Sequence, residues 1–158
     1  MGMRALGKDN LLNSFHYLID SDIFVALFMP DDALALTVDH LMSDIEKQRK
    51  SLCTTNWVVA ETATVLSRKD SQASAIKFLS MIDKGHIPVL PVTPELEREA
   101  HRIFREQTTK KTSMVDCSNV AVATHYDISE LLSFDNFYTR FEYQVQKVIL
   151  SRQEHVQL

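Results

Sequence analysis

The sequence predicts a three-layer α/β domain in which helices cover both faces of a parallel β-sheet. Two observations support this prediction. Helical and strand patterns alternate along the chain, which favours a parallel sheet. The opening strand pattern, Tyr17–Ile19, is apolar without alternation, as in a strand buried on both faces. Because 158 residues suit one domain, we expect a loosely attached N-terminal arm at residues 1–15 and a single domain at 16–158.

Local signals delimit the elements of the first half of the chain. Pro30 ends a short apolar helix, because proline cannot continue one. Asp31 and Asp32 are expected to begin a longer helix, whose apolar residues recur at three- and four-residue spacing. Asn56 is expected to cap the next helix. The expected ranges are, in chain order, a helix at about 22–28, a helix from 31 to 50, a strand at 51–54 and a helix at 57–69.

The second half of the chain continues the alternation. Gly85 ends a helix whose apolar Leu79 is expected to face inward. Pro88 places the next strand at a sheet edge. Pro94 takes the first position of a further helix, with Phe104 on its apolar side. The expected ranges are a helix at 71–84, a strand at 87–90, a helix opening at 93–95, a polar loop at 107–112, a helix at 113–126, and strands at 130–133 and 146–150.

Composition excludes several classes of protein. The formal net charge of −4 argues against a generally basic nucleic-acid binder but is compatible with a basic rim beside an acidic metal site. Three glycines are too few for phosphate-cradling loops. Cys53 and Cys117 indicate neither a disulfide framework nor a metal site. No apolar run reaches the roughly 18 residues that a membrane helix needs. We therefore expect a cytoplasmic protein that does not contact the membrane.

Four acidic residues lie at positions where a charged side chain is unexpected. Asp20 and Asp135 each follow a buried strand directly, at the end where open α/β sheets bind ligands. Glu61 lies inside an apolar helix, where an uncompensated carboxylate is costly, and Asp116 lies in the first turn of another helix. Each also has an ordinary explanation: a helix cap for Asp20, solvation or an ion pair for Glu61, a capping pair with Ser113 for Asp116, and a turn for Asp135.

The combination of these four residues points to one metal site. Carboxylates from strand ends, a helix start and a helix interior can converge on one cleft, where they would repel one another without a cation. Oxygen-only ligands suit Mg²⁺ or Mn²⁺, which also bind phosphate oxygens. Such a site suits phosphodiester hydrolysis, because the metal lowers the pKa of a bound water and orients the scissile phosphate.

With these motifs the chain resembles the PIN-domain nucleases, and most closely the VapC-type toxin ribonucleases, over about residues 17–150. Four motifs carry the resemblance: Ile19-Asp20-Ser21, Val59-Ala60-Glu61, the loop and helix start at 111–117, and Ser133-Phe134-Asp135-Asn136-Phe137. The resemblance implies a five-stranded parallel sheet in the order 3-2-1-4-5 and a divalent-metal endoribonuclease, either a toxin or a related RNA-processing enzyme. It also implies a homodimer and, for a toxin, an antitoxin that covers the site.

The resemblance also assigns roles to individual residues. It implies that the catalytic and metal-binding residues are Asp20, Glu61, Asp116 and Asp135. It implies supporting or substrate-contacting roles for Ser21, Asp22, Ser113, Ser133 and Lys111. Asn119 is either a ligand through water or, as we expect, a surface residue. A basic set either steers a phosphate backbone or is a solvated face; it comprises Arg68, Lys69, Lys110, Lys111 and Arg140. Trp57 and Phe137 either stack on bases or, as we expect, pack in the core.

Two other functions remain open from the sequence. A PIN fold could serve as a non-catalytic RNA-binding or protein-docking module, although all four acidic residues are present. Asp20-Ser21-Asp22 also imitates the nucleophile motif of haloacid-dehalogenase-type phosphatases, in which Asp20 would be phosphorylated. That motif requires Thr or Val two residues after the second Asp, where this chain has Phe24.

Overall fold

A parallel β-sheet of five strands forms the centre of the computed structural model, which describes residues 15–141 and 146–148. The strand order is β3-β2-β1-β4-β5, and every neighbouring pair is parallel, as expected. The strands are β1 (Tyr17–Ile19), β2 (Leu52–Thr55), β3 (Val89–Leu90), β4 (Glu130–Leu132) and β5 (Gln146–Val148). The edge position of β3 confirms the expectation from Pro88, because proline lacks the N–H that an interior strand donates.

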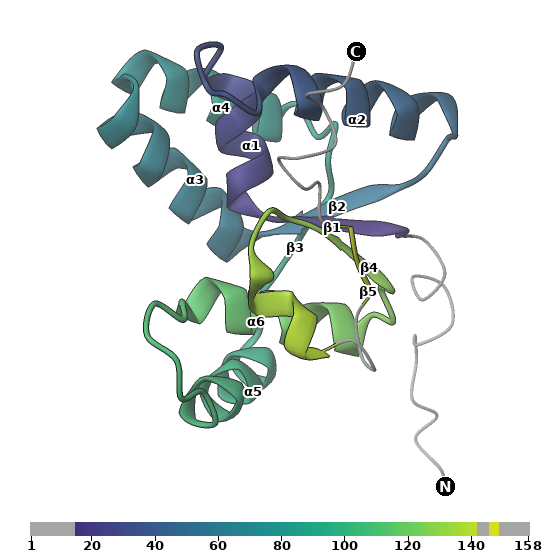
Figure 1. The fold of residues 1–158 in the computed structure, drawn as a ribbon, viewed down its shortest axis with the longest axis vertical. Helices are drawn as coiled ribbons and strands as arrows, with labels where there is room; N and C mark the ends of the chain where they lie inside the picture. Colours follow the sequence, from purple (N-terminus) through teal and green to yellow (C-terminus); the bar gives the residue numbers. More distant parts are fainter. Residues whose placement is uncertain (1–14, 142–145, 149–158) are drawn as a thin grey trace, which may run out of the picture.

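Helices cover the sheet on both faces (Figure 1), which confirms the predicted three layers. One face carries α1 (Ser21–Phe28), α2 (Ala35–Lys47), α3 (Asn56–Lys69) and α4 (Gln72–Asp83). The other face carries α5 (Pro94–Arg105), α6 (Met114–His125) and a 3₁₀ helix, η1 (Asn136–Phe141), that the sequence reasoning did not anticipate. No helix in the described ranges is long and apolar enough to cross a membrane.

Strand β1 shows why the sheet is buried on both sides. Leu18 packs into a cluster with residues of α5 and α6, whereas Ile19 packs into a cluster with residues of α1 to α4. Both side chains are fully buried, since successive residues of a strand point to opposite faces. The strand therefore needs no polar alternation.

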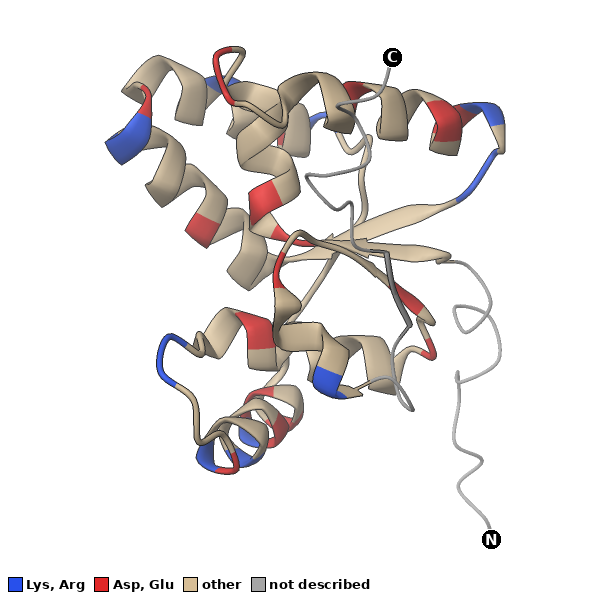
Figure 2. Ribbon diagram, viewed as in Figure 1, with Lys and Arg blue, Asp and Glu red and all other residues tan. Residues whose placement is uncertain are grey.

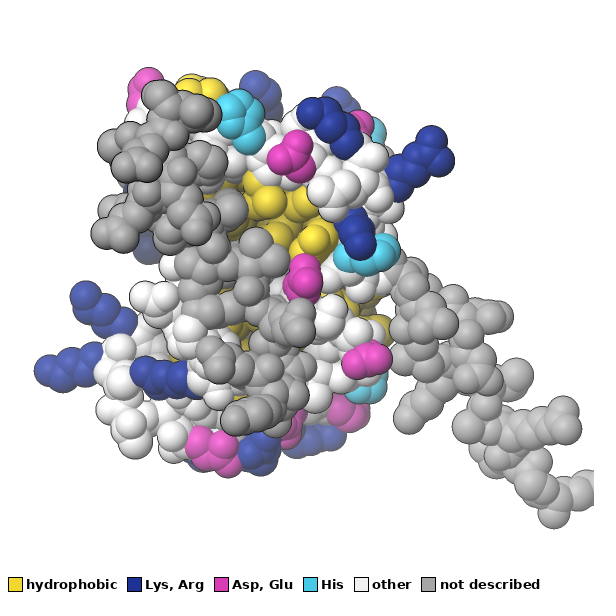
Figure 3. All heavy atoms as spheres, turned by 45° about the vertical axis from the view of Figure 1, so that its right-hand side comes forward, with side chains coloured by type: hydrophobic (Ala, Val, Ile, Leu, Met, Phe, Trp, Pro, Cys, Tyr) yellow, Lys and Arg dark blue, Asp and Glu magenta, His cyan; other side chains and the backbone are white. Residues whose placement is uncertain are grey.

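Hydrophobic side chains show in one hollow on the face drawn in Figure 3, surrounded by charged and histidine side chains.

Several expected boundaries and exposures are wrong, each for a local reason. Helix α2 begins at Ala35 and not at the two aspartates, because the Asp32 carboxylate accepts the Leu34 N–H at 2.8 Å and closes a turn. Thr55 caps α3 by accepting the Val58 N–H at 3.1 Å. Asn56, the expected cap, accepts the Val92 N–H at 2.8 Å instead. 

Two apolar residues expected on inner helix faces are partly exposed: 38% for Leu79 and 40% for Phe104. Each follows a buried residue by one position, Phe78 and Ile103, and therefore lies at the margin of its helix's apolar face. The expected N-terminal arm falls outside the described residues except for Phe15, which packs against the cluster around Leu18. The last two residues of the strand expected at 146–150 also fall outside them.

Candidate active site

The predicted acidic residues lie along the carboxyl edge of the sheet. Strands β1 and β4 are neighbours, and the Asp20 N–H donates to the Leu132 carbonyl at 3.0 Å, so the ends of both strands lie side by side. Asp20 directly follows β1, Asp116 lies in the first turn of α6, and Ser133 directly follows β4. Figure 2 shows acidic segments of β1–α1, α3, α6 and the β4–η1 loop on this side of the molecule.

Asp20 is the most buried carboxylate of the group, with 3% of its surface exposed. One oxygen accepts the Ser21 N–H at 2.7 Å and an Asn119 amide N–H at 3.1 Å. The other lies 3.0 Å from the Ser133 hydroxyl and 2.7 Å from the Tyr138 hydroxyl. Asp20 therefore serves as the N-cap of α1, as its alternative interpretation proposed, and also stands at the centre of a polar network.

Tyr138 connects two of the acidic residues and was missed by the sequence reasoning. Its hydroxyl lies 2.7 Å from Asp20 Oδ2 and 3.2 Å from Asp116 Oδ1, although the side chain is fully buried. The sequence contains only a weak indication of this role, namely that the hydroxyl of a buried tyrosine usually forms a hydrogen bond. The neighbouring Phe137 packs in the core, as expected.

Asn119 is fully buried, which corrects the expectation of a surface residue. It lies one helical turn after Asp116, so its side chain points to the same cluster. Its amide nitrogen donates to Asp20 Oδ1 at 3.1 Å and to the Tyr138 hydroxyl at 3.0 Å. Its Oδ1 is buried and has no hydrogen-bond partner among the described residues. The sequence signal that could have identified it is this spacing from Asp116.

Asp22 ties α1 to the loop that follows β4. Its Oδ2 accepts the Phe134 N–H at 2.7 Å and lies 3.1 Å from the Ser133 hydroxyl. Because that hydroxyl has one proton, Ser133 donates to either Asp20 or Asp22 at a given moment. The Asp22 Oδ1 is buried without a partner in the described part of the chain. Asp22 is thus a fifth carboxylate beside the cluster.

Glu61 and Asp135 lie at the margin of the cluster. Glu61 is half-buried and accepts a hydrogen bond from the Ser21 hydroxyl at 2.6 Å, which connects α3 to the end of β1. Asp135 is exposed, accepts the Phe137 N–H at 2.8 Å and donates its own N–H to the Ser133 hydroxyl at 3.0 Å. The alternative interpretation of Asp135 as a turn residue therefore also holds.

Asp116 is both a helix cap and a member of the carboxylate cluster. It forms a capping box with Ser113: its N–H donates to the Ser113 hydroxyl at 3.0 Å, and its carboxylate accepts the Ser113 N–H at 3.3 Å. The same carboxylate faces the Tyr138 hydroxyl and is 7% exposed. The Asp116 carboxylate therefore caps α6 and also belongs to the cluster.

The cluster carries more negative charge than its surroundings compensate. Burial, and then the nearby Asp20 and Asp135 carboxylates, raise the pKa of Asp116 to about 7. Burial, followed by the Asp20 charge, raises the pKa of Asp22 to about 7. Burial also raises the pKa of Asp20, against the opposing effect of its hydrogen bonds. No Lys or Arg in the described ranges forms an ion pair with any of these groups. Adding a cation would relieve this repulsion.

The donor chemistry suits a hard divalent cation, although the ligands are not already gathered around one point. Among the described residues, no three His, Cys, Asp or Glu side chains form a group that could hold a metal ion as they stand. The available donors are all oxygens, which Mg²⁺ and Mn²⁺ prefer. Two of them, Asn119 Oδ1 and Asp22 Oδ1, are buried without a partner in the described residues.

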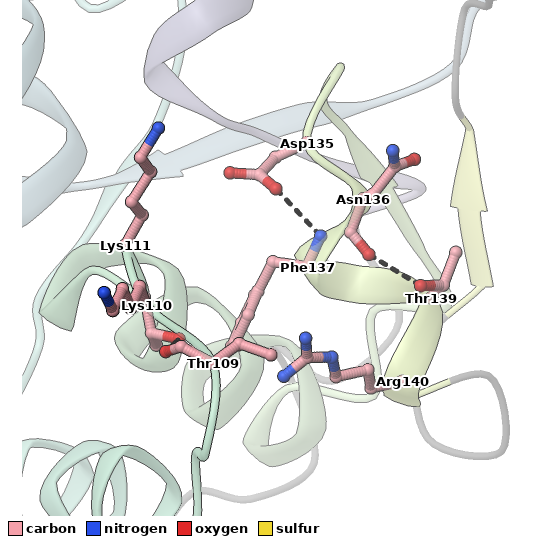
Figure 4. A pocket seen from close by; sticks show the side chains of 9 residues that line it. Thr109, Lys110, Lys111, Asp135, Asn136, Phe137, Thr139 and Arg140 are labelled. Atoms are coloured by element: carbon pink, nitrogen blue, oxygen red, sulfur yellow. Dashed lines mark hydrogen bonds between the residues drawn. The ribbon is translucent and has the colours of Figure 1, made fainter.

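The basic residues expected at the rim fall into two groups. Lys110, Lys111 and Arg140 line a cavity of about 430 Å³ together with Asp135. Figure 4 shows the two lysines on one side of this cavity, and Asp135 and Arg140 on the other. The remaining two, at 68–69, lie in the last turn of α3, about two helical turns beyond Glu61, and do not line the cavity. Trp57, half-buried at the start of α3, stays unassigned.

Solved structures with a similar fold include toxins and toxin–antitoxin complexes. VapC20 of Mycobacterium tuberculosis, a sarcin–ricin loop cleaving toxin, has a TM-score of 0.72 and 24% identity over 79% of this chain and 94% of its own. VapBC2 of Rickettsia felis, bound to a DNA fragment from its promoter, has a TM-score of 0.64 and 12% identity over 85% and 98%. FitAcB of Neisseria gonorrhoeae has a TM-score of 0.58 and 15% identity over 83% and 95%.

At these identities the likeness concerns the fold alone. No curated relative matches the chain. A family model described as PIN domain matches residues 17–142, which is most of the sequence. The match confirms the family resemblance that the four motifs indicated, and this chain belongs to the PIN domain family.

Proposed function

We propose that this chain is a divalent-metal-dependent endoribonuclease that hydrolyses RNA phosphodiester bonds, acting as the toxin of a toxin–antitoxin pair or as a related RNA-processing nuclease. The observation that supports this most strongly is the pair of buried carboxylates, Asp20 and Asp116, which face one hydroxyl in a PIN-family chain and lack a compensating cation in the described residues. Such an arrangement is costly for folding alone, which favours a functional reason for it.

In this proposal Asp20, Glu61, Asp116 and Asp135 hold the metal and form the catalytic group. The chemistry that bound Mg²⁺ or Mn²⁺ supplies there is activation of water and stabilisation of the charge that develops on the phosphate. Ser21 and Ser133 orient the carboxylates through their hydroxyl groups.

Three further residues support the site. Asp22 keeps the β4–η1 loop in place through the Phe134 N–H, and Ser113 holds Asp116 through the capping box. Lys111, which has no carboxylate partner in the described ranges, contacts the substrate phosphate.

The proposed partners follow from the same reasoning. Two of the similar structures are VapBC proteins, VapBC2 of Rickettsia felis and VapBC-5 of Mycobacterium tuberculosis, and the latter is described as a member of the VapBC family of toxin–antitoxin systems. These likenesses support an antitoxin partner for this chain. A homodimer and a cytoplasmic location remain predictions from the resemblance and the composition.

The family match makes the phosphatase interpretation wrong, since that enzyme class has a different fold family. Asp22, its required general acid, is also bound to the loop after β4. Two observations favour the non-catalytic module: a tyrosine hydroxyl lies between the carboxylates, and the described acidic residues are not already arranged as a metal site.

The test is cleavage of a panel of structured RNAs, including tRNA and a sarcin–ricin fragment of ribosomal RNA, with Mg²⁺, with Mn²⁺ and with a chelator. We expect cutting that needs the metal and that Asp20→Asn abolishes. Asp44→Asn makes the same chemical change at an exposed position on α2 and should cut like wild type. RNA binding without cutting by folded, metal-supplied protein would reject the nuclease in favour of the binding module.

A further inference from the structure

Three of the rim cations lie together beside the carboxylate cluster. Lys110 and Lys111 belong to the loop between α5 and α6, and Arg140 belongs to η1, so segments far apart in the sequence bring three cations to one cavity. Asp135 lines the same cavity and connects it to the cluster through Ser133. On the other side, α1 contains no Lys or Arg, and α3 has them only in its last turn.

The three cations are available to bind an anion. None of them forms an ion pair with a carboxylate in the part of the chain that the structure describes. Arg140 is also held in place: its Nη1 donates to Gln107 Oε1 at 3.1 Å, and the Gln107 amide nitrogen donates to the Ile103 carbonyl of α5 at 2.9 Å. A guanidinium fixed in this way suits phosphate recognition, because little side-chain entropy remains to be lost.

The other residues that line the cavity are the aromatic Phe137 and the polar residues Thr109, Thr112, Asp135, Asn136 and Thr139. Its volume, about 430 Å³, falls within the roughly 300–1,000 Å³ of pockets that hold small molecules, a size class that includes one nucleotide. The Thr139 hydroxyl donates to the Asn136 carbonyl at 2.6 Å. Its oxygen is therefore left to accept a hydrogen bond, such as one from a ribose 2′-hydroxyl, which distinguishes RNA from DNA.

We propose that this cavity binds one single-stranded ribonucleotide that flanks the scissile phosphate, with the phosphate of that nucleotide between Lys110, Lys111 and Arg140. The inference rests on the proposed function and deepens it. It gives the substrate a direction of approach: the strand passes from the carboxylate cluster over Asp135 into the cavity. It also divides the five rim cations into three that contact RNA and two, at 68–69, that do not.

The test compares two double variants that remove the same charge from exposed lysine and arginine positions. Lys110→Ala/Lys111→Ala empties one side of the cavity, and Arg68→Ala/Lys69→Ala is the matched control at the end of α3. Binding of a fluorescent single-stranded RNA is measured by anisotropy in chelator between 50 and 200 mM salt, ranges suited to counterion release. Each lost phosphate contact on single-stranded RNA should reduce the slope of log K against log salt by about 0.7.

Because the three cations share one phosphate, we expect the cavity double variant and Arg140→Ala each to reduce this slope by up to about 0.7, with no change in the control. The KM for RNA should rise in the cavity variants by a larger factor than kcat falls. Thr139→Val should reduce the preference for RNA over DNA of the same sequence. Equal slopes in the two double variants would overturn the inference.

The failures of the two proposals are distinguishable. If wild type cuts RNA but the cavity variants bind it like the control, the ribonucleotide cavity is rejected and the nuclease stands. If the cavity variants lose RNA affinity as expected but wild type cuts no RNA, the catalytic proposal is rejected and the binding cavity stands.

Discussion

Removal of the Tyr138 hydroxyl is the sharpest structural perturbation of the carboxylate cluster. Tyr138→Phe deletes one oxygen and leaves the ring, which is fully buried against Phe137, in place. The deleted atom lies 2.7 Å from Asp20 and 3.2 Å from Asp116, and accepts the Asn119 amide at 3.0 Å. Asn119 keeps its other bond, to Asp20, so the variant loses the connection between the two carboxylates without leaving that amide unpaired.

The expected loss of stability follows from the type of bond. A hydrogen bond to a charged group contributes about 1.5–3 kcal/mol to the free energy of unfolding. In a domain of this size 1 kcal/mol shifts the Tm by about 2–4 °C, so Tyr138→Phe should lower the Tm in chelator by roughly 3–12 °C. Tyr126→Phe is the matched control, because Tyr126 is half-buried and its hydroxyl forms no hydrogen bond among the described residues. It should change the Tm little.

The expected effect on metal binding tests function rather than folding. Without the hydroxyl, the repelling Asp20 and Asp116 carboxylates are no longer held toward each other. Loss of such supporting bonds typically costs 10–100-fold in metal affinity, or about 1.4–2.8 kcal/mol. Mn²⁺ calorimetry should show this loss, and excess Mn²⁺ should restore cleavage. Unchanged or tighter Mn²⁺ binding by Tyr138→Phe would refute the reasoning and make the hydroxyl a competitor of the metal.

Other consequences of the cluster are testable separately. The pKa values of Asp22 and Asp116 are raised to about 7. The folded protein therefore binds more protons than the unfolded chain between about pH 4 and 7. The free energy of unfolding, measured in chelator, should fall as the pH rises through that window. Thermal melts at pH 5.5 and 8 check this, and Asp116→Asn should reduce the difference; a higher Tm at pH 8 would contradict it. Ser133→Ala removes the hydroxyl that contacts Asp20, Asp22 and the Asp135 N–H. It should lower the free energy of unfolding measured in urea by about 1–3 kcal/mol. An unchanged midpoint of urea unfolding would contradict a stabilising role for these hydrogen bonds.

The main elements and the acidic residues were predictable because they depend on local patterns and on sheet geometry. Asp20 and Ser133 directly follow strands that a buried apolar run identifies, and parallel neighbours bring their ends together. The capping box of Asp116 is a local motif that a four-residue window contains. In these cases the short-range signal and the tertiary position coincide.

Tyr138 and Asn119 could not be predicted in the same way. The Tyr138 hydroxyl meets Asp20, which follows the first strand, only because η1 brings the chain back against α6. No local pattern indicated that 3₁₀ helix. The burial of Asn119 depends on this same contact. The prediction of Asn56 as the N-cap of α3 was wrong for a more local reason. Thr55 and Asn56 are both good capping residues. The Asn56 side chain accepts the Val92 N–H of a distant loop, which leaves Thr55 as the cap.

The most direct test of the central claim measures RNA binding and RNA cleavage on the same sample of Asp116→Asn. This change removes the charge and keeps the shape of a carboxylate that faces Tyr138 at 3.2 Å. RNA binding should persist in Asp116→Asn, because the basic cavity is intact, and metal-dependent cleavage should be lost, while Asp44→Asn retains both. Cleavage by Asp116→Asn at the wild-type rate would contradict the assignment of this cluster as the catalytic metal site.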